Sequence, residues 1–185
     1  MNSKIFLAKQ LGETAQIIDW AINLVPEDRL LEIPPHSTHP KADESMQRYF
    51  GLWSAYRLMF HLVHYEENWA LPGLKFWLGE SIPAKKDIPN EKEMWDKELV
   101  KGVDLNLMLK RFHSVRVKQI EALSKMSDEV WKEKKTNTYW GEATAEFSVS
   151  KTIQHTLEHG NKLTRIAIHW DRLLEYLDLL RTDAD

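Results

Sequence analysis

Two histidines in the C-terminal part of the sequence have the spacing of a metal-binding pair. His155 and His159 are four residues apart, and on a helix this separation places two side chains one turn apart on the same face. Two neutral imidazoles in that arrangement can bind one divalent cation. Eight histidines in 185 residues give roughly 0.3 such pairs by chance, so the pair alone is a weak signal. Hydrogen bonding of each buried imidazole to a carbonyl or carboxylate is the alternative.

A line of polar side chains on an earlier segment supplies further candidates. Between about residues 43 and 69, large apolar residues cover most of the circumference of a predicted helix, and only one stripe is polar. This stripe faces either solvent or a polar groove inside a bundle, and the segment by itself leaves both interpretations open. Its members follow one another at steps of three or four residues: Ser54, Arg57, His61, His64 and Asn68.

The composition limits both the ligand chemistry and the class of partner. The chain has no cysteine, which excludes disulfides, a thiolate nucleophile and cysteine-rich zinc sites. A formal net charge of -3 provides no overall positive field for nucleic acid or anionic lipid. No apolar run approaches the roughly 20 residues of a membrane span, and residues 1–6 lack the pattern of a signal peptide. We therefore expect a cytoplasmic protein without nucleic-acid or membrane partners.

Four long amphipathic segments are expected to position the candidate residues. The last of them would be roughly 50 Å long at 1.5 Å per residue, or shorter if it bends. Together they indicate an all-α protein, a four-helix bundle that forms a single domain over residues 1–185. Helical periodicity predicts these segments at about residues 5–25, 43–69, 105–126 and 148–180.

The connections should contain loops and short extra helices. Prolines predict loops at residues 34–40 and after residue 79, and Pro72 with Gly73 should break the second long helix. Asn90 is followed by Glu93 in a capping arrangement that predicts a short helix ending near residue 100. The helical period is lost over residues 131–147, which predicts a loop or a short hairpin.

The two histidine-containing segments resemble those of a known family. Residues 151–159, KTIQHTLEH, look like the H-x-x-x-H element of the DinB-like (YfiT-like) superfamily of metal-dependent enzymes, and residues 61–66, HLVHYE, are similar to its single histidine followed five residues later by glutamate. The resemblance covers nearly the whole chain. It implies an up-down four-helix bundle in which three histidines bind a divalent ion, often nickel or zinc. The implied ligands are His61, His155 and His159, with His64 as the alternative to His61 on the same polar stripe.

The resemblance also implies a class of reaction. The family includes thiol-dependent transferases and isomerases, and in a chain without cysteine a small thiol would have to arrive as a cosubstrate. We therefore expect a metal-dependent enzyme, either a small-thiol-dependent transferase or a hydrolase of small molecules. The alternative is a non-catalytic ligand-binding or interaction bundle. Gly160 departs from the family pattern, because many members have an arginine directly after the second histidine of the pair.

Several other polar residues are candidates for supporting roles. Glu158, Glu66 and Arg116 are the catalytic candidates, although charged residues on bundle helices are usually exposed or paired. Eight tryptophans are compatible with a core, a pocket wall or a homodimer interface. Four residues are weaker candidates for contacts with the pocket: Arg57, His113, Tyr139 and Trp140.

Overall fold

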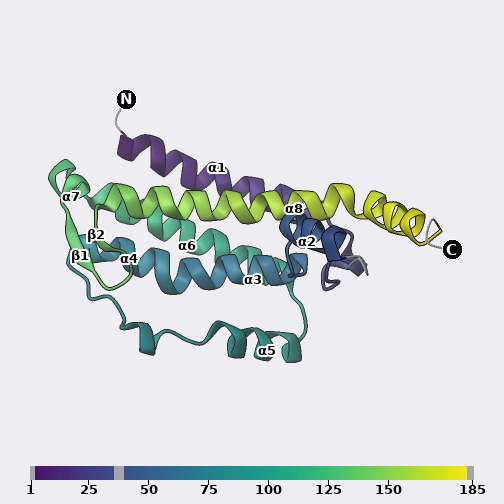
Figure 1. The fold of residues 1–185 in the computed structure, drawn as a ribbon. Coiled ribbons are helices and arrows are strands. Elements are labelled where there is room, and N and C mark those ends of the chain that lie inside the picture. Colours follow the sequence, from purple (N-terminus) through teal and green to yellow (C-terminus); the bar gives the residue numbers. More distant parts are fainter. Residues whose placement is uncertain (1–2, 36–39, 183–185) are drawn as a thin grey trace.

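The computed structural model describes residues 3–35 and 40–182 and confirms an all-α bundle (Figure 1). The four long helices are α1 (Ser3–Asn23), α3 (Ala55–Tyr65), α6 (Leu105–Lys125) and α8 (Ala145–Thr182). Contacts between these helices show that α1 and α8 run parallel to each other, as do α3 and α6, and that the two pairs run in opposite directions. The chain therefore runs up, down, down and up through the bundle.

A long crossover allows α3 and α6 to run in the same direction. After η3 (Phe76–Leu78) the chain returns along the length of the bundle through η4 (Lys85–Asp87) and α5 (Glu91–Lys101) (Figure 1). Asn90 caps α5 by accepting the Glu93 amide at 3.1 Å, as the sequence predicts. The crossover places α5 alongside α3, which brings its first turn to the polar stripe of that helix.

The predicted helix over residues 43–69 is two helices, and the prediction of one was wrong. α2 (Pro40–Phe50) ends at Gly51, whose φ of 82° is left-handed and favours glycine. Ser54 then caps α3 by accepting the Arg57 amide at 3.2 Å. The loop predicted at residues 34–40 falls mostly outside the described residues, because the description resumes at the start of α2.

The second half of that segment also differs from the expectation. Beyond Tyr65 the helix continues as a π-helical turn, η2 (Glu66–Ala70), and then as α4 (Leu71–Lys75). Pro72 does not break the helix, because it lies in the first turn of α4. Backbone amides in a first turn make no hydrogen bond within the helix, so the missing N–H of proline is tolerated there. η2 also aims Glu66 inward, and its side chain is fully buried.

Shorter elements close the two ends of the bundle. η1 (Glu27–Arg29) follows α1, and α7 (Asp128–Lys132) follows α6. Residues 131–147, where the helical period is lost, contain a short hairpin, with β1 (Lys135–Asn137) antiparallel to β2 (Gly141–Ala143). α8 begins at Ala145, slightly earlier than predicted, because Thr144 accepts the Phe147 amide. Its 38 residues would span about 57 Å if straight.

Apolar side chains fill the bundle in two clusters. The larger one joins α1, α3, α6 and α8 around Tyr56, Met59 and Phe112, and the smaller one surrounds Trp77 and Trp131 near the hairpin. Burial of these large side chains against each other holds the helices together. Within the described residues, no helix has both the length and the apolar character to cross a membrane.

Candidate metal centre

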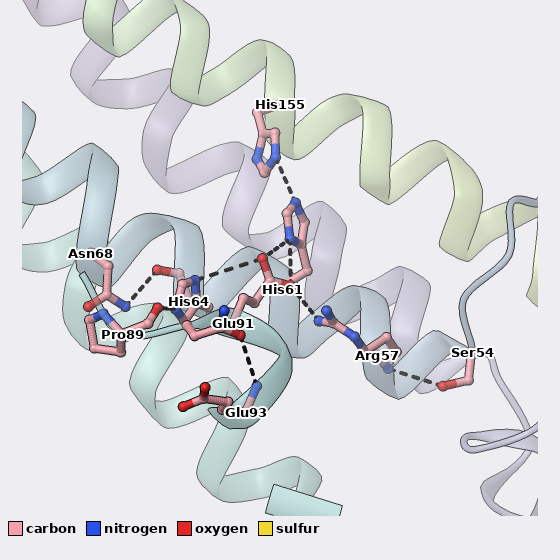
Figure 2. A network of polar contacts seen from close by, with 10 residues as sticks. Ser54, Arg57, His61, His64, Asn68, Pro89, Glu91, Glu93 and His155 are labelled. Atoms are coloured by element: carbon pink, nitrogen blue, oxygen red, sulfur yellow. Dashed lines mark hydrogen bonds and ion pairs between the residues drawn. The ribbon is translucent and has the colours of Figure 1, made fainter. Parts of the chain in front are cut away.

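The structure brings together three of the histidines singled out in the sequence. His61 points from α3 toward α8, where His155 and His159 occupy successive turns (Figure 2 shows the first two). One ring nitrogen from each lies within 4.8 Å of the others. The Nε2 atoms of His61 and His155 are 3.1 Å apart. Antiparallel packing of α3 and α8 therefore forms a group of three imidazoles that could hold a metal ion.

The distances and partners in this group fit a divalent ion. Zinc–nitrogen bonds of about 2.0–2.1 Å place two ligand nitrogens about 2.8–3.4 Å apart for angles between 90° and 109°, and the His61–His155 separation of 3.1 Å lies in this range. Nδ1 of His155 and Nδ1 of His159 are buried and have no hydrogen-bond partner among the described residues. Carbonyl or carboxylate groups therefore do not satisfy these two nitrogens, contrary to the alternative considered from the sequence.

Burial keeps the pair on α8 in the form that binds metals. It lowers the pKa of His155 and of His159 to about 3, and the neighbouring imidazoles and lysines add to the effect. Both rings are therefore neutral at physiological pH. Neutral imidazole has the free lone pair that a metal ligand needs.

A carboxylate that the sequence did not reveal orients His61. Both oxygens of Glu91, at the start of α5, lie 3.0 Å from His61 Nδ1 (Figure 2). Arg57 Nη1 lies 2.6 Å from the same carboxylate. Burial disfavours the charge of Glu91, but His61 and Arg57 outweigh it and lower the pKa of Glu91 to about 2. An ionised Glu91 accepts a hydrogen bond from Nδ1–H of His61, so the lone pair of Nε2 faces the other histidines, as in carboxylate–histidine–metal sites.

His64, the alternative ligand, lies outside the group of three. Its Nε2 donates to the Pro89 carbonyl oxygen at 3.0 Å, and its Nδ1 is 3.9 Å from Glu91. His64 is only 5% exposed and Ser54 only 3%. The residues before and at the start of α5 cover the polar stripe of α3, so the stripe lines a polar groove rather than a solvent-facing surface.

Aromatic side chains enclose the three imidazoles. The Trp53 ring is nearly parallel to that of His159, with an interplanar angle of 8° and centroids 6.3 Å apart, and its centroid lies 4.9 Å from that of His61. Tyr65 packs against His155 with a centroid distance of 4.0 Å. Burial raises the pKa of Tyr65 to about 12, so its phenol stays protonated. These rings limit the rotation of the histidines and keep much of the solvent from them.

An open cleft of about 500 Å³ reaches the group at His159. It lies between α2, the turn after α2 and α8. Because a wall of the cleft includes His159, a small molecule in the cleft would lie next to this candidate ligand. The lining residues are Glu44, Gln47, Arg48, Gly51, Leu52, Trp53, Leu58, His159 and Lys162.

Two of the catalytic candidates form an ion pair in the core. Arg116 donates to Glu66, and their side chains are 2% and 0% exposed. Gln119 Nε2 also donates to Glu66 at 3.1 Å, and Thr156, the residue after His155, is hydrogen-bonded to both members of the pair. Burial raises the pKa of Glu66 and lowers that of Arg116. The cleft walls, as far as the described residues define them, include neither residue.

The remaining candidates lie away from the three histidines. Glu158 is exposed and accepts from Gln154 on the outer side of α8. His113 pairs with Asp19 at 2.7 Å. Tyr139 packs against a neighbouring tryptophan and donates to a carbonyl in the crossover. Trp140 packs against the smaller core cluster.

Gly160 has a packing role at the position where the family pattern often has arginine. It is buried against α1, and a Cβ atom there would lie 3.0 Å from Ile18 Cδ1. A larger side chain would force α1 and α8 apart or displace Ile18. The close approach of α1 to α8 therefore accounts for the glycine.

The sequence matches the family model of the DinB superfamily over residues 10–163. The match extends from α1 into α8 and includes His61, His155 and His159. Neither curated proteins nor solved structures match the sequence. Because the match covers most of its length, the chain belongs to the DinB superfamily.

Proposed function

We propose that this protein is a metal-dependent enzyme acting on small molecules, with His61, His155 and His159 as ligands of a divalent ion. The observation that carries the proposal is the convergence of these imidazoles beside a cleft of about 500 Å³. Three protein ligands leave coordination positions open, which distinguishes catalytic from structural sites. Nickel and zinc are the proposed metals, since both accept imidazole ligands.

The side chains around the site have separable tasks in this proposal. Glu91 fixes the orientation of His61 through the hydrogen bond to Nδ1, and Arg57 holds Glu91 in place. Trp53 and Tyr65 restrict the rings and exclude water. When bound, the ion would supply Lewis-acid chemistry toward water, a carbonyl or a thiol. The proposed reaction is hydrolysis, or transfer to or from a small thiol. Because the chain has no cysteine, that thiol would be a cosubstrate.

Metal content per chain tests the ligand assignment. We expect about one zinc or nickel ion per chain by plasma mass spectrometry after reloading tag-free protein. His61→Ala, His155→Ala and His159→Ala should each lose it while keeping helical circular dichroism. His113→Ala is the matched control, because it removes a histidine that pairs with Asp19 elsewhere on the bundle.

The outcomes separate the competing assignments. Metal loss in His64→Ala but not in His61→Ala would show that His64, and not His61, is the third ligand. A reloaded, folded wild type without metal would refute the proposal and favour a non-catalytic ligand-binding bundle.

Catalysis itself is tested with a panel of esters and of electrophiles supplied with a small thiol. We expect turnover that requires the reloaded metal and disappears in His155→Ala. Equal rates in the wild type and this variant would contradict metal dependence.

A further inference from the structure

Among the described residues that line the cleft beside His159, one cationic side chain has no acidic partner. Arg48, on α2, is paired with Glu44 at 2.9 Å. Among the described residues, by contrast, no carboxylate lies within ion-pair distance of Lys162. One positive charge in the cleft is therefore available to a ligand.

The position of Lys162 relates it directly to the candidate metal site. Lys162 follows His159 by three residues on α8, so the two side chains share one face of the helix. A ligand that reached both residues would extend over only one helical turn.

The glycine turn after α2 lies next to the lysine side chain. A Cβ atom on Gly51 would lie 3.5 Å from Cδ and 3.7 Å from Nζ of Lys162. The left-handed φ of Gly51 disfavours any other residue there. The turn and the lysine together therefore shape this end of the cleft.

The rest of the cleft offers apolar surface. Leu52 is 54% exposed next to Trp53, and Leu58 forms a further part of the wall. A wall of this kind suits the hydrocarbon part of a ligand, and a few placed polar groups fix its orientation. A single ammonium group matches a singly charged carboxylate, whereas phosphate is usually held by several donors or an arginine fork.

We propose that the cleft binds small amphipathic carboxylates, with the carboxylate on Lys162 and the apolar part against Leu52 and Trp53. This inference rests on the proposed function only in that the far end of such a molecule would lie near His159 and the metal. It identifies Lys162 as a specificity-determining residue for an anionic substrate.

Two probes of nearly the same size and shape, one charged and one neutral, test this assignment. 4-Phenylbutyrate and its neutral amide are titrated into wild-type protein, both metal-free and zinc-loaded, with ligand-observed NMR as the readout. We expect the carboxylate to bind about tenfold more tightly than the amide, the usual effect of a hydrogen bond to a charged group. Lys162→Met, which keeps the aliphatic stem, should lose about this factor, and Lys162→Arg should retain binding within about threefold.

Lys151→Met is the matched control. It removes the same charge from the same helix, four residues before His155, and Lys151 does not line the cleft. We expect its affinity for 4-phenylbutyrate to stay within about twofold of wild type. Circular dichroism of each variant verifies the fold.

The inference would be overturned by equal affinity for the two probes, by no effect of Lys162→Met, or by equal effects of Lys162→Met and Lys151→Met. Loss of 4-phenylbutyrate binding from metal-free wild type would also overturn it, because the carboxylate would then bind the metal rather than Lys162. Lys162-dependent binding in a protein that takes up no metal would support the inference and refute the proposed function.

Discussion

Replacing Glu91 removes the carboxylate that orients His61 without changing any of the three proposed ligands. Both of its oxygens lie 3.0 Å from His61 Nδ1. Loss of such a partner typically weakens metal affinity by about 10- to 100-fold, or about 1.4–2.7 kcal/mol. Glu91→Gln keeps an oxygen that can accept from Nδ1 but loses the charge facing Arg57, so we expect about tenfold. Glu91→Ala loses both and leaves the Arg57 charge near the metal, so we expect about 100-fold.

Zinc affinity is measured by competition with a chromophoric chelator at neutral pH. Glu93→Gln is the control, because Glu93 is exposed in the same turn of α5 and its replacement removes the same charge without a contact to His61. We expect a change of at most about twofold in this control. An equal loss in Glu91→Ala and Glu93→Gln would show that only the long-range field matters. An unchanged affinity in Glu91→Ala would refute the orienting role.

Three further predictions concern the stability of the metal-free protein. Burial lowers the pKa of His155 and His159 to about 3, below the roughly 6.5 of unfolded chains. Between these pH values the unfolded state binds more protons than the folded state, so the free energy of unfolding, measured with urea, should decrease as the pH falls from 6.5. The two residues together contribute a decrease of at most about 2.7 kcal/mol per pH unit. A free energy of unfolding that stays constant from pH 6.5 to 5 would contradict this prediction. Glu66→Gln or Arg116→Met should each cost about 3–5 kcal/mol in urea unfolding, because the remaining buried charge loses its partner, and the double variant should recover most of the loss; additive costs would argue against the ion pair. Gly160→Arg should lower the free energy of unfolding by about 1–3 kcal/mol, because the larger side chain would overpack against α1. An unchanged melting temperature would refute that contact.

The sequence predicted the helices well where local signals determine them. Periodicity located the long helices, and Asn90 caps α5 as its position indicated. The signals for dividing the second helix were also local, since Gly51 and Ser54 end α2 and begin α3, but the apolar period across them concealed the break. The parallel course of α3 and α6 depends on the length and path of the crossover, which periodicity does not encode.

The candidate site shows the same division between local and tertiary information. The spacing of His155 and His159 is local, and a single turn of α8 places them together. His61 could be assigned only by family resemblance, because the other two proposed ligands are 94 residues away or more. Glu91 gave no sign of its role, since that role exists only after the crossover lays α5 against α3. Lys162 has helical spacing from His159, but its cleft depends on the turn at Gly51.

Anomalous diffraction at the zinc absorption edge, from crystals of the zinc-loaded protein, tests the three-histidine site most directly. We expect one strong peak about 2.0–2.1 Å from a ring nitrogen of each of His61, His155 and His159. A map with no peak between these residues, or with zinc bound to His64 in place of His61, would contradict the account.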